Sequence, residues 1–433
     1  MSYSTSLAGL LHQRYHVVAE QEYLLGLRGL LTLEAFIWVF LHVFVPAAVK
    51  GNNIPGPTYQ VILRKTLSVI FWNEDLLYSA FTLLSARTIC IPFFKNPTKT
   101  SIASACFRRS IRLYFPVAVA LIIVKLTSSQ SGLARIERFK TYTDNNYFDT
   151  PYYMVNAISC FNSGFMVFWT TFGFATQSGS KAFPSQTLWI LNVIYSQSYT
   201  IFMTMVIIPY TRTKWRVQAF ICFIITAWWV QSWAWYSITG LLFADMVMNM
   251  DFKAKSKRGI KIWRSIRCPT WIPAALLMTA GLTMMYIWAA WKPQDTNVEL
   301  KAHTGIYYTG SLNYHYDLSQ PQARVDNYVF LAGFFLLLES SSILQWMLKN
   351  PFLYYLGNRS LSWYLVQSVI IYTIGIRLFM HLSVDRHASF GAAVVACLVT
   401  CFAVSAAGAE IFYRVLDYPS LALAHKLFDW IRE

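Results

Sequence analysis

Residues Tyr23–Val49 read YLLGLRGLLTLEAFIWVFLHVFVPAAV, a stretch long and apolar enough to cross a bilayer as one helix. The stretch nevertheless carries three ionisable side chains, Arg28, Glu34 and His42. Such groups are costly in hydrocarbon, so they usually face the interior of a helix bundle and have a function there. The stretch therefore predicts the first helix of a polytopic membrane protein with a polar interior.

The spacing of Arg28 and His42 predicts that both lie on the same face of this helix. Their 14-residue step turns through about 1400°, within roughly 40° of whole turns, and covers about 21 Å along the axis. The guanidinium group is then near one membrane surface and the imidazole is past the midplane. Such a helix can bind an anion at one end and move a proton further in. Alternatively, Arg28 only extends to lipid headgroups and His42 only bonds a neighbouring helix.

The composition supports an all-α transmembrane bundle. Of the 433 residues, 56% are hydrophobic and only 13% are charged, against about 25% charged residues in soluble domains. The formal charge of +16 comes mainly from Lys and Arg between the apolar stretches, where membrane topology requires them, so no nucleic-acid partner is predicted. The seven cysteines lack CxxC or His-paired spacing, so no metal site is predicted.

The apolar stretches predict about ten spans, with both termini in the cytoplasm. Short basic segments alternate along the chain in the way that this topology requires. We divide the chain into a cytoplasmic segment 1–22, a transmembrane domain 23–420 and a cytoplasmic tail 421–433. Tyr152–Phe174 is interpreted as re-entrant or interfacial. The predicted spans are Leu24–Val49, Asp75–Phe94, Phe107–Leu126, Gln186–Ile208, a hairpin within Val217–Met250 with its turn near Ser232–Tyr236, Trp271–Trp291, Tyr328–Leu348, Leu361–Met380 and Phe390–Tyr413.

Four arginines are predicted to meet at the cytoplasmic ends of the first and third spans. They are Arg28 and, in the first turns of the third span, Arg108, Arg109 and Arg112. Arg109 and Arg112 are three residues apart and so share a helix face, and guanidinium groups grip phosphate in a bidentate manner. A helix start adds partial positive charge. The alternative is that these arginines only enforce the orientation of the protein in the membrane.

His42 is the predicted general base, because a neutral imidazole can accept a proton from a hydroxyl group near neutral pH. Glu34 lies about 80° around the same helix and two turns earlier, too far to orient His42 directly. A carboxylate from another span is needed for that role, and Asp75 and the mid-span Glu339 are the two candidates.

The chain resembles the acyltransferase-3 family of integral-membrane acyltransferases, especially its fungal members. The resemblance is carried by Gly26–Phe44, by FRRSIRLYFP at Phe107–Pro116, by ITGLLFADM at Ile238–Met246, and by Phe352–Ile371 followed by YRVLDYPS at Tyr413–Ser420. It implies a ten-span bundle that transfers an acyl group, usually acetyl, from acyl-CoA to a hydroxyl of a carbohydrate, lipid or secondary metabolite. Acyl-CoA is then a co-substrate, and no cofactor is bound permanently.

The family pattern and this chain differ at the catalytic base. The family has an Arg or Lys near the start of span one and a His eleven positions later; Arg28 matches the first, but the second position is Val39. His42 lies three residues further on, roughly on the same helix face. The resemblance also implies that the R-x-x-R of Arg109 and Arg112 is suited to the CoA phosphates.

Two other functions remain open from the sequence. A proton-coupled transporter or lipid flippase would use Arg28, Glu34 and His42 as a pathway without consuming CoA. A family member whose active site is lost would explain the displaced histidine. In each case we expect a multi-pass protein of the endoplasmic reticulum or plasma membrane.

Overall fold

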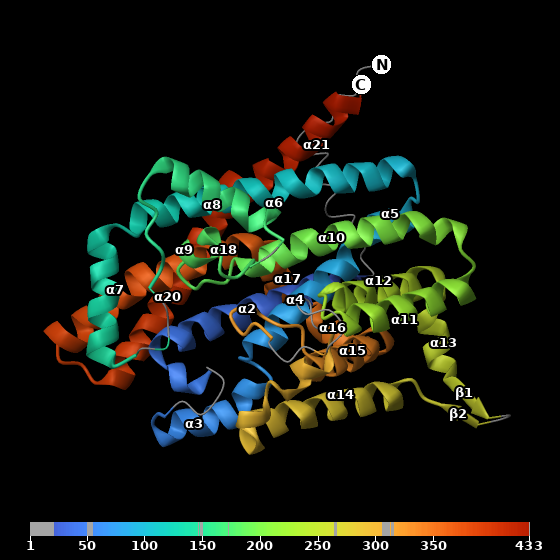
Figure 1. Ribbon diagram of the computed structural model, residues 1–433, viewed down its shortest axis with the longest axis horizontal. Helices are drawn as coiled ribbons and strands as arrows, with labels where there is room; N and C mark the ends of the chain where they lie inside the picture. The colour runs from blue at the N-terminus through green and yellow to red at the C-terminus, as the bar shows by residue number, and fades with distance from the viewer. Residues whose placement is uncertain are drawn as a thin grey trace.

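Long apolar helices form most of the chain (Figure 1). The computed structural model describes residues 21–49, 55–145, 147, 150–171, 173–263, 266–304, 312 and 316–432. The predicted N-terminal segment 1–22 therefore lies outside the described residues, apart from Gln21 and Glu22. The longer helices are α2 (Glu22–Phe44), α4 (Glu74–Ile89), α6 (Lys99–Thr127), α7 (Gln130–Thr143), α8 (Ala157–Trp169), α10 (Trp189–Ile207), α11 (Thr213–Trp229), α12 (Ala234–Asn249), α14 (Trp271–Tyr286), α15 (Val325–Ser340), α18 (Ser360–Ile370), α20 (Phe390–Phe412) and α21 (Tyr418–Arg432).

Shorter elements join or extend these helices. Two π-helical segments, η8 and η9, continue α18 through α19, and another, η10, joins α20 to α21. The short elements are α3 (Thr58–Lys65), α5 (Ile91–Lys95), α9 (Ser178–Ala182), α13 (Phe252–Arg258), α16 (Ser342–Leu348), α17 (Pro351–Asn358), α19 (Ile376–Met380), η2 (Pro46–Ala48), η3 (Leu67–Val69), η4 (Ile208–Tyr210), η5 (Ile287–Trp291), η6 (Pro293–Asp295), η7 (Val298–Ala302), η8 (Ile371–Gly375), η9 (His381–Asp385) and η10 (Tyr413–Asp417).

Seven helical stretches of the described chain are long and apolar enough to cross a membrane. A bent pair, α15 and α16, makes an eighth if it is counted as one span. The prediction of a helical bundle with several helices able to span a membrane is confirmed at this level. The seven stretches are Glu22–Phe44, Leu67–Lys95, Lys99–Thr127, Trp189–Tyr210, Trp271–Trp291, Ser360–Asp385 and Phe390–Arg432.

Several predicted boundaries are wrong. The stretch predicted as one straight span, Tyr328–Leu348, bends by 96° between α15 and α16. The bend is at Ser341, where the backbone is extended. The Ser341 side-chain oxygen accepts a hydrogen bond from the Leu344 N–H and so caps the start of α16. The hairpin turn predicted near Ser232–Tyr236 lies a few residues earlier, because α11 ends at Trp229 and α12 begins at Ala234. Residues 421–432 of the predicted tail belong to α21.

The predicted all-α class fits this architecture, apart from one short strand pair. Two short antiparallel strands, β1 (Ile260–Trp263) and β2 (Ile266–Cys268), lie in the basic segment after α13. Isoleucines alternate there with Lys261 and Arg267, a two-residue period that favours a strand over a helix.

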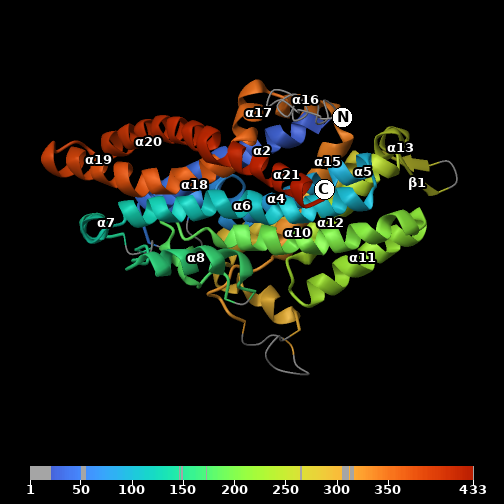
Figure 2. The same ribbon diagram turned by 90° about the horizontal axis from the view of Figure 1, so that it is seen from above.

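Helix α2 lies inside the bundle, where it contacts α4, α17 and α18 (Figures 1 and 2). Its contact with α17 is unusually close because two glycines face the opposite backbone. A Cβ atom on Gly29 would lie 1.9 Å from the carbonyl oxygen of Leu353, and one on Gly357 would lie 1.9 Å from that of Leu25. The glycines of GLRG and LGN therefore set the distance between these helices.

A fully buried ion pair ties the beginning of α2 to α4 and α15. The Arg87 Nε lies 2.8 Å from Glu339 Oε1, and the Tyr23 hydroxyl donates to Glu339 Oε2 at 2.5 Å. Arg87 Nη1 also donates to the side-chain oxygen of Gln21 at 3.3 Å. Glu339 is thus held in an ion pair at the start of α2 and serves the packing of the bundle.

We expect Glu339→Leu to destabilise the protein by about 3–5 kcal/mol, because it leaves the Arg87 charge buried and uncompensated. The measurement is the apparent melting temperature of the purified protein in detergent. The matched control is the double variant Arg87→Met and Glu339→Leu, which removes both charges and should recover most of the loss. A single variant as stable as the wild type would contradict this role.

Candidate functional site

Three of the four predicted arginines line one cavity inside the bundle. Arg28 reaches it from α2, and Arg109 and Arg112 reach it from α6. The cavity has a volume of about 120 Å³, and we call it the arginine cavity. Its other lining residues are Phe81, Ser85, Leu113, Ile190, Leu191, Ile194, Asn358, Ser360, Leu361, Tyr364 and Asp417. One carboxylate among three guanidinium groups leaves the lining with net positive charge.

Hydroxyl groups of α4 hold two of these guanidinium groups in place. Arg109 Nη2 donates to Ser85 Oγ at 3.1 Å, and Arg28 Nη2 donates to Thr88 Oγ1 at 3.0 Å. Ser85 and Thr88 are three residues apart and therefore share one face of α4. The arginines are thus positioned before any ligand binds, which lowers the entropic cost of binding an anion.

The prediction that the start of a helix adds partial positive charge beside these arginines is wrong. Helix α6 begins at Lys99, so Arg109 and Arg112 lie well beyond its first turn, where the helix dipole has little effect. Arg108 is also not part of the arginine cavity. Its Nε donates to the Ser104 carbonyl at 3.0 Å, and its Nη1 lies 2.8 Å from His425 Nδ1 of α21. Arg108 points away because consecutive helical residues are about 100° apart.

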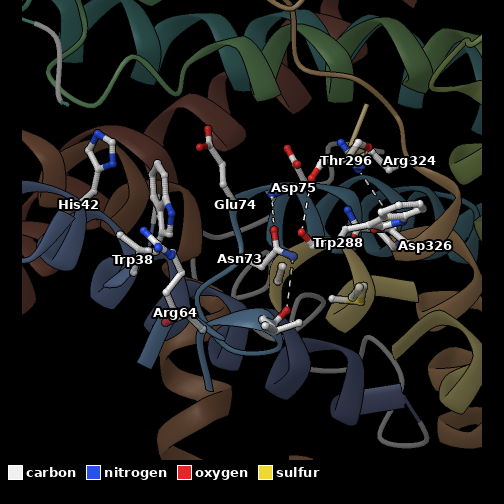
Figure 3. Close-up of a pocket in the computed structure, with 16 residues that line it drawn as sticks. Trp38, His42, Arg64, Asn73, Glu74, Asp75, Trp288, Thr296, Arg324 and Asp326 are labelled. Atoms are coloured by element: carbon white, nitrogen blue, oxygen red, sulfur yellow. Dashed lines mark hydrogen bonds and ion pairs between the residues drawn. The ribbon is translucent and has the colours of Figure 1, made fainter. Parts of the chain in front are cut away.

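His42 lines two further cavities, which also share Trp38 and Glu74. We call them the histidine cavities; their volumes are about 180 and 360 Å³. The imidazole stacks on Trp38, with ring centroids 5.2 Å apart and an angle of 27° between the planes. In Figure 3, Trp38 lies beside His42, and Glu74 and Asp75 follow along the pocket.

The first histidine cavity has a dense set of charges at its other end. Arg324 Nε lies 3.3 Å from Glu299 Oε1 and 3.7 Å from Asp326 Oδ1. Burial alone would lower the pKa of Arg324, but Asp326, Glu299 and Asp75 raise it above its ordinary value. Burial raises the pKa of Glu299 to about 7, more than the Arg324 charge lowers it. Figure 3 shows Arg324 and Asp326 together at this end.

The structure separates the predicted acidic residues. Asp75 lines the first histidine cavity, and its neighbour Glu74 lines both, so Glu74 is the better placed carboxylate. Glu339 is too far away to orient His42. It bonds Tyr23, which precedes His42 by 19 residues on one helix, or about 28 Å. Glu34 is half-buried and belongs to the lining of neither the arginine cavity nor the histidine cavities.

Sequence reasoning missed Trp38, Arg64, Glu74, Arg324 and Asp326, which all line the first histidine cavity. A signal existed for some of them. Glu74 and Asp75 open α4 just after Asn73, whose side chain caps the helix by accepting from Asp75 N at 3.1 Å. An acidic pair at the start of a span points to a polar mouth. Nothing local in the sequence indicates that Arg64 and Arg324 meet this mouth, since both come from separate elements.

The arginine cavity and the second histidine cavity both reach α2, α10 and the α18 segment. On α2 they are lined by Arg28 and by Trp38 with His42 respectively, and on the α18 segment by Tyr364 and Tyr372. Three buried rings pack together beside the histidine cavities. They are Trp38, Tyr78 and Trp189, with centroids 6.0 Å apart for the first pair and 5.0 Å for the second.

A scan of family models, a search of curated proteins and a search of solved structures each find no significant match to this chain. The chemistry of the cavities is therefore the basis for a functional assignment. Three of the sequence stretches that carry the acyltransferase-3 resemblance meet at the arginine cavity. They contribute Arg28, Arg109 with Arg112, and Asn358 with Asp417. The fourth stretch contributes Gly240, which packs against the backbone of α4.

Proposed function

We propose that the protein is a membrane-bound O-acyltransferase that moves an acyl group, in the first instance acetyl, from acyl-CoA to a hydroxyl group. The acceptor is a carbohydrate, a lipid or a secondary metabolite. The observation that carries the proposal is the meeting of Arg28, Arg109 and Arg112 around one cavity. The resemblance of the surrounding sequence to acyltransferase-3 motifs supplies the nature of the donor.

The arginine cavity is the proposed binding site for the phosphates of acyl-CoA. Guanidinium groups bind phosphate oxygens in a bidentate manner, and three of them offset much of the negative charge of the donor. The volume of about 120 Å³ suits a phosphate group rather than a whole nucleotide. The adenosine would therefore lie outside the cavity, and the pantetheine arm would extend along α2 toward His42.

His42 is the proposed general base. Its neutral imidazole accepts the proton of the acceptor hydroxyl while the oxygen attacks the thioester carbonyl. A C–O bond forms, the C–S bond breaks, and the thiolate leaves and takes the proton from the imidazolium ion, which yields free CoA. Glu74, which lines both histidine cavities, is the carboxylate best placed to stabilise that imidazolium ion.

A ten-span topology with both termini in the cytoplasm remains part of the proposal. Its support beyond the seven long helices and the bent pair is the hairpin of α11 and α12, which pack together and contain 17 and 16 residues. At 1.5 Å per residue, each is about 25 Å long, close to the thickness of the hydrocarbon core. Helix α8, with 13 residues, is too short to cross. The membrane is proposed to be the endoplasmic reticulum or the plasma membrane.

The decisive experiment measures free thiol released from acetyl-CoA by the purified protein in the presence of pooled hydroxyl-bearing acceptors. We expect CoA release that depends on the acceptors. We also expect acetyl-CoA to raise the apparent melting temperature, because a ligand that binds only the folded state stabilises it. The control ligand is dephospho-CoA, which lacks one phosphate and should stabilise less. The absence of both CoA release and a thermal shift would contradict the proposal.

A proton-coupled transporter or flippase is the second candidate. Cavities that reach α2 at Arg28 and at His42 favour it, because alternating access needs a site that can open to either side. The same preparation distinguishes the two functions. Uptake of a substrate into proteoliposomes without CoA consumption would favour transport over acyl transfer.

A further inference from the structure

A second group of arginines lies at another part of the molecule, where the arginine cavity and the histidine cavities do not reach. A groove of about 760 Å³ runs between α7 and the segment η8–η9, and we call it the α7 groove. Arg135 and Arg138 reach it from α7, and Arg377 reaches it from α19. Its other lining residues are Thr373, Ile374, Leu378, Met380, His381, Val384 and Asp385. Figures 1 and 2 both show α7 and the α19 segment at the same end of the bundle.

The α7 groove is a built feature rather than a loose surface depression. Three aromatic rings fix α7 against the bundle: Phe139 lies 5.4 Å from Phe379 and 5.6 Å from Phe44, and Phe44 lies 5.5 Å from Phe379 between ring centroids. In Figure 1, α7 crosses the end of the bundle at a steep angle to the long helices. If the long helices span a membrane, a helix across their end lies near its interface.

The charges of the groove are unbalanced. Arg135, Arg138 and Arg377 are exposed, and none of them makes an ion pair or hydrogen bond with another residue that the structure describes. The one carboxylate in the lining is already engaged, since Asp385 Oδ2 lies 2.8 Å from His381 Nδ1. Three guanidinium groups without a protein partner, facing one groove, select a ligand with several negative oxygens.

Four of the other lining residues are apolar, which decides between a soluble and a membrane ligand. Ile374, Leu378, Met380 and Val384 contribute hydrocarbon beside the arginines, and Ile374 is 40% exposed. A free phosphate ion gains nothing from these side chains, whereas a lipid offers an acyl chain to them and a phosphate to the arginines. We propose that the α7 groove binds the phosphate headgroup of an anionic membrane lipid. This site does not depend on the proposed acyl transfer.

The test uses native mass spectrometry of the full-length protein, purified in detergent and titrated with phosphatidylglycerol. We expect the triple variant Arg135→Gln, Arg138→Gln and Arg377→Gln to bind the lipid at least about tenfold more weakly than the wild type. The matched control removes the same charge from α13, by Lys255→Gln, Lys257→Gln and Arg258→Gln, and should bind the lipid like the wild type. If the triple variant fails to fold, Arg377→Gln alone carries the test, with Arg386→Gln as its control.

Two further arms define the ligand. Phosphatidylcholine should bind at least several-fold more weakly than phosphatidylglycerol, and 10 mM inorganic phosphate, on the order of a cellular level, should not displace the lipid. Equal binding of phosphatidylglycerol by the groove variant and the wild type would overturn the proposal. Displacement of the lipid by inorganic phosphate would also overturn the proposal, since the ligand would then be a soluble phosphate. Equal affinity for phosphatidylcholine and phosphatidylglycerol would overturn it as well.

Discussion

Acetyl-CoA is expected to bind at least about 100-fold more weakly to the variant Arg109→Gln and Arg112→Gln than to the wild type, because hydrogen bonds to charged groups contribute about 1.5–3 kcal/mol each. Both side chains line the arginine cavity, and Arg109 is held there by Ser85. Glutamine keeps most of the volume and some hydrogen bonding, so the loss reports charge rather than a collapsed cavity. The dissociation constant is measured by calorimetry or by the ligand concentration dependence of the melting temperature.

The same helix offers a matched control for this experiment. Arg108→Gln removes one positive charge next to Arg109 in the sequence, but Arg108 contacts Ser104 and His425 outside the arginine cavity. This variant should bind acetyl-CoA within about twofold of the wild type, because Arg108 does not line the cavity and its guanidinium group is held by Ser104 and His425. If Arg108→Gln weakens binding as much as the double variant, the effect comes from general surface charge and the assignment of the cavity fails.

Acyl transfer is expected to fall by about 10²–10⁴-fold in His42→Ala, the usual effect of losing a general base. Binding of acetyl-CoA should stay within about twofold of the wild type, because His42 lies about 21 Å along α2 from Arg28. The measurement is kcat for thiol release together with the dissociation constant. A loss of kcat without a loss of binding separates the chemical step from the binding of the donor.

The position of the family histidine provides the control for His42. Val39 is 1% exposed and lines neither the arginine cavity nor the histidine cavities. Restoring a histidine there, as Val39→His in the His42→Ala background, should therefore fail to recover activity. Full acyl-transfer activity in His42→Ala would remove the assignment of the base. Recovery by Val39→His would mean that the base acts from the family position instead.

The sequence was sufficient to predict most of the first helix, although α2 ends at Phe44 rather than at Val49, and that Arg28, Arg109 and Arg112 lie close together. Helical spacing places Arg109 and Arg112 on one face of α6, and the predicted topology placed Arg28 at the same end of the bundle. The predicted span Trp271–Trp291 also begins and ends at the same residues as α14 together with η5. Continuous apolar stretches between clear breaks are the part of a membrane protein that hydropathy predicts best.

The pairing of polar groups across the bundle was not predictable. Glu339 looked free to act on His42, yet it pairs with Arg87, a residue whose sequence context on α4 resembles an ordinary helix end. The charges of Arg64 and Arg324 reach the histidine cavity from separate elements, and no spacing in one chain encodes such a meeting. The bend at Ser341 was missed because the apolar residues continue on both sides of it.

The contact between Gly29 and Gly357 restricts how this chain can change. Each glycine faces a carbonyl group of the other helix rather than a side chain, so trimming a neighbouring side chain cannot make room for a larger residue. Only a shift of an entire helix would do so, and that shift would carry Arg28 away from Thr88. During evolution, the lining of the histidine cavities can diversify residue by residue, whereas the contact between Gly29 and Gly357 can change only together with the arginine cavity.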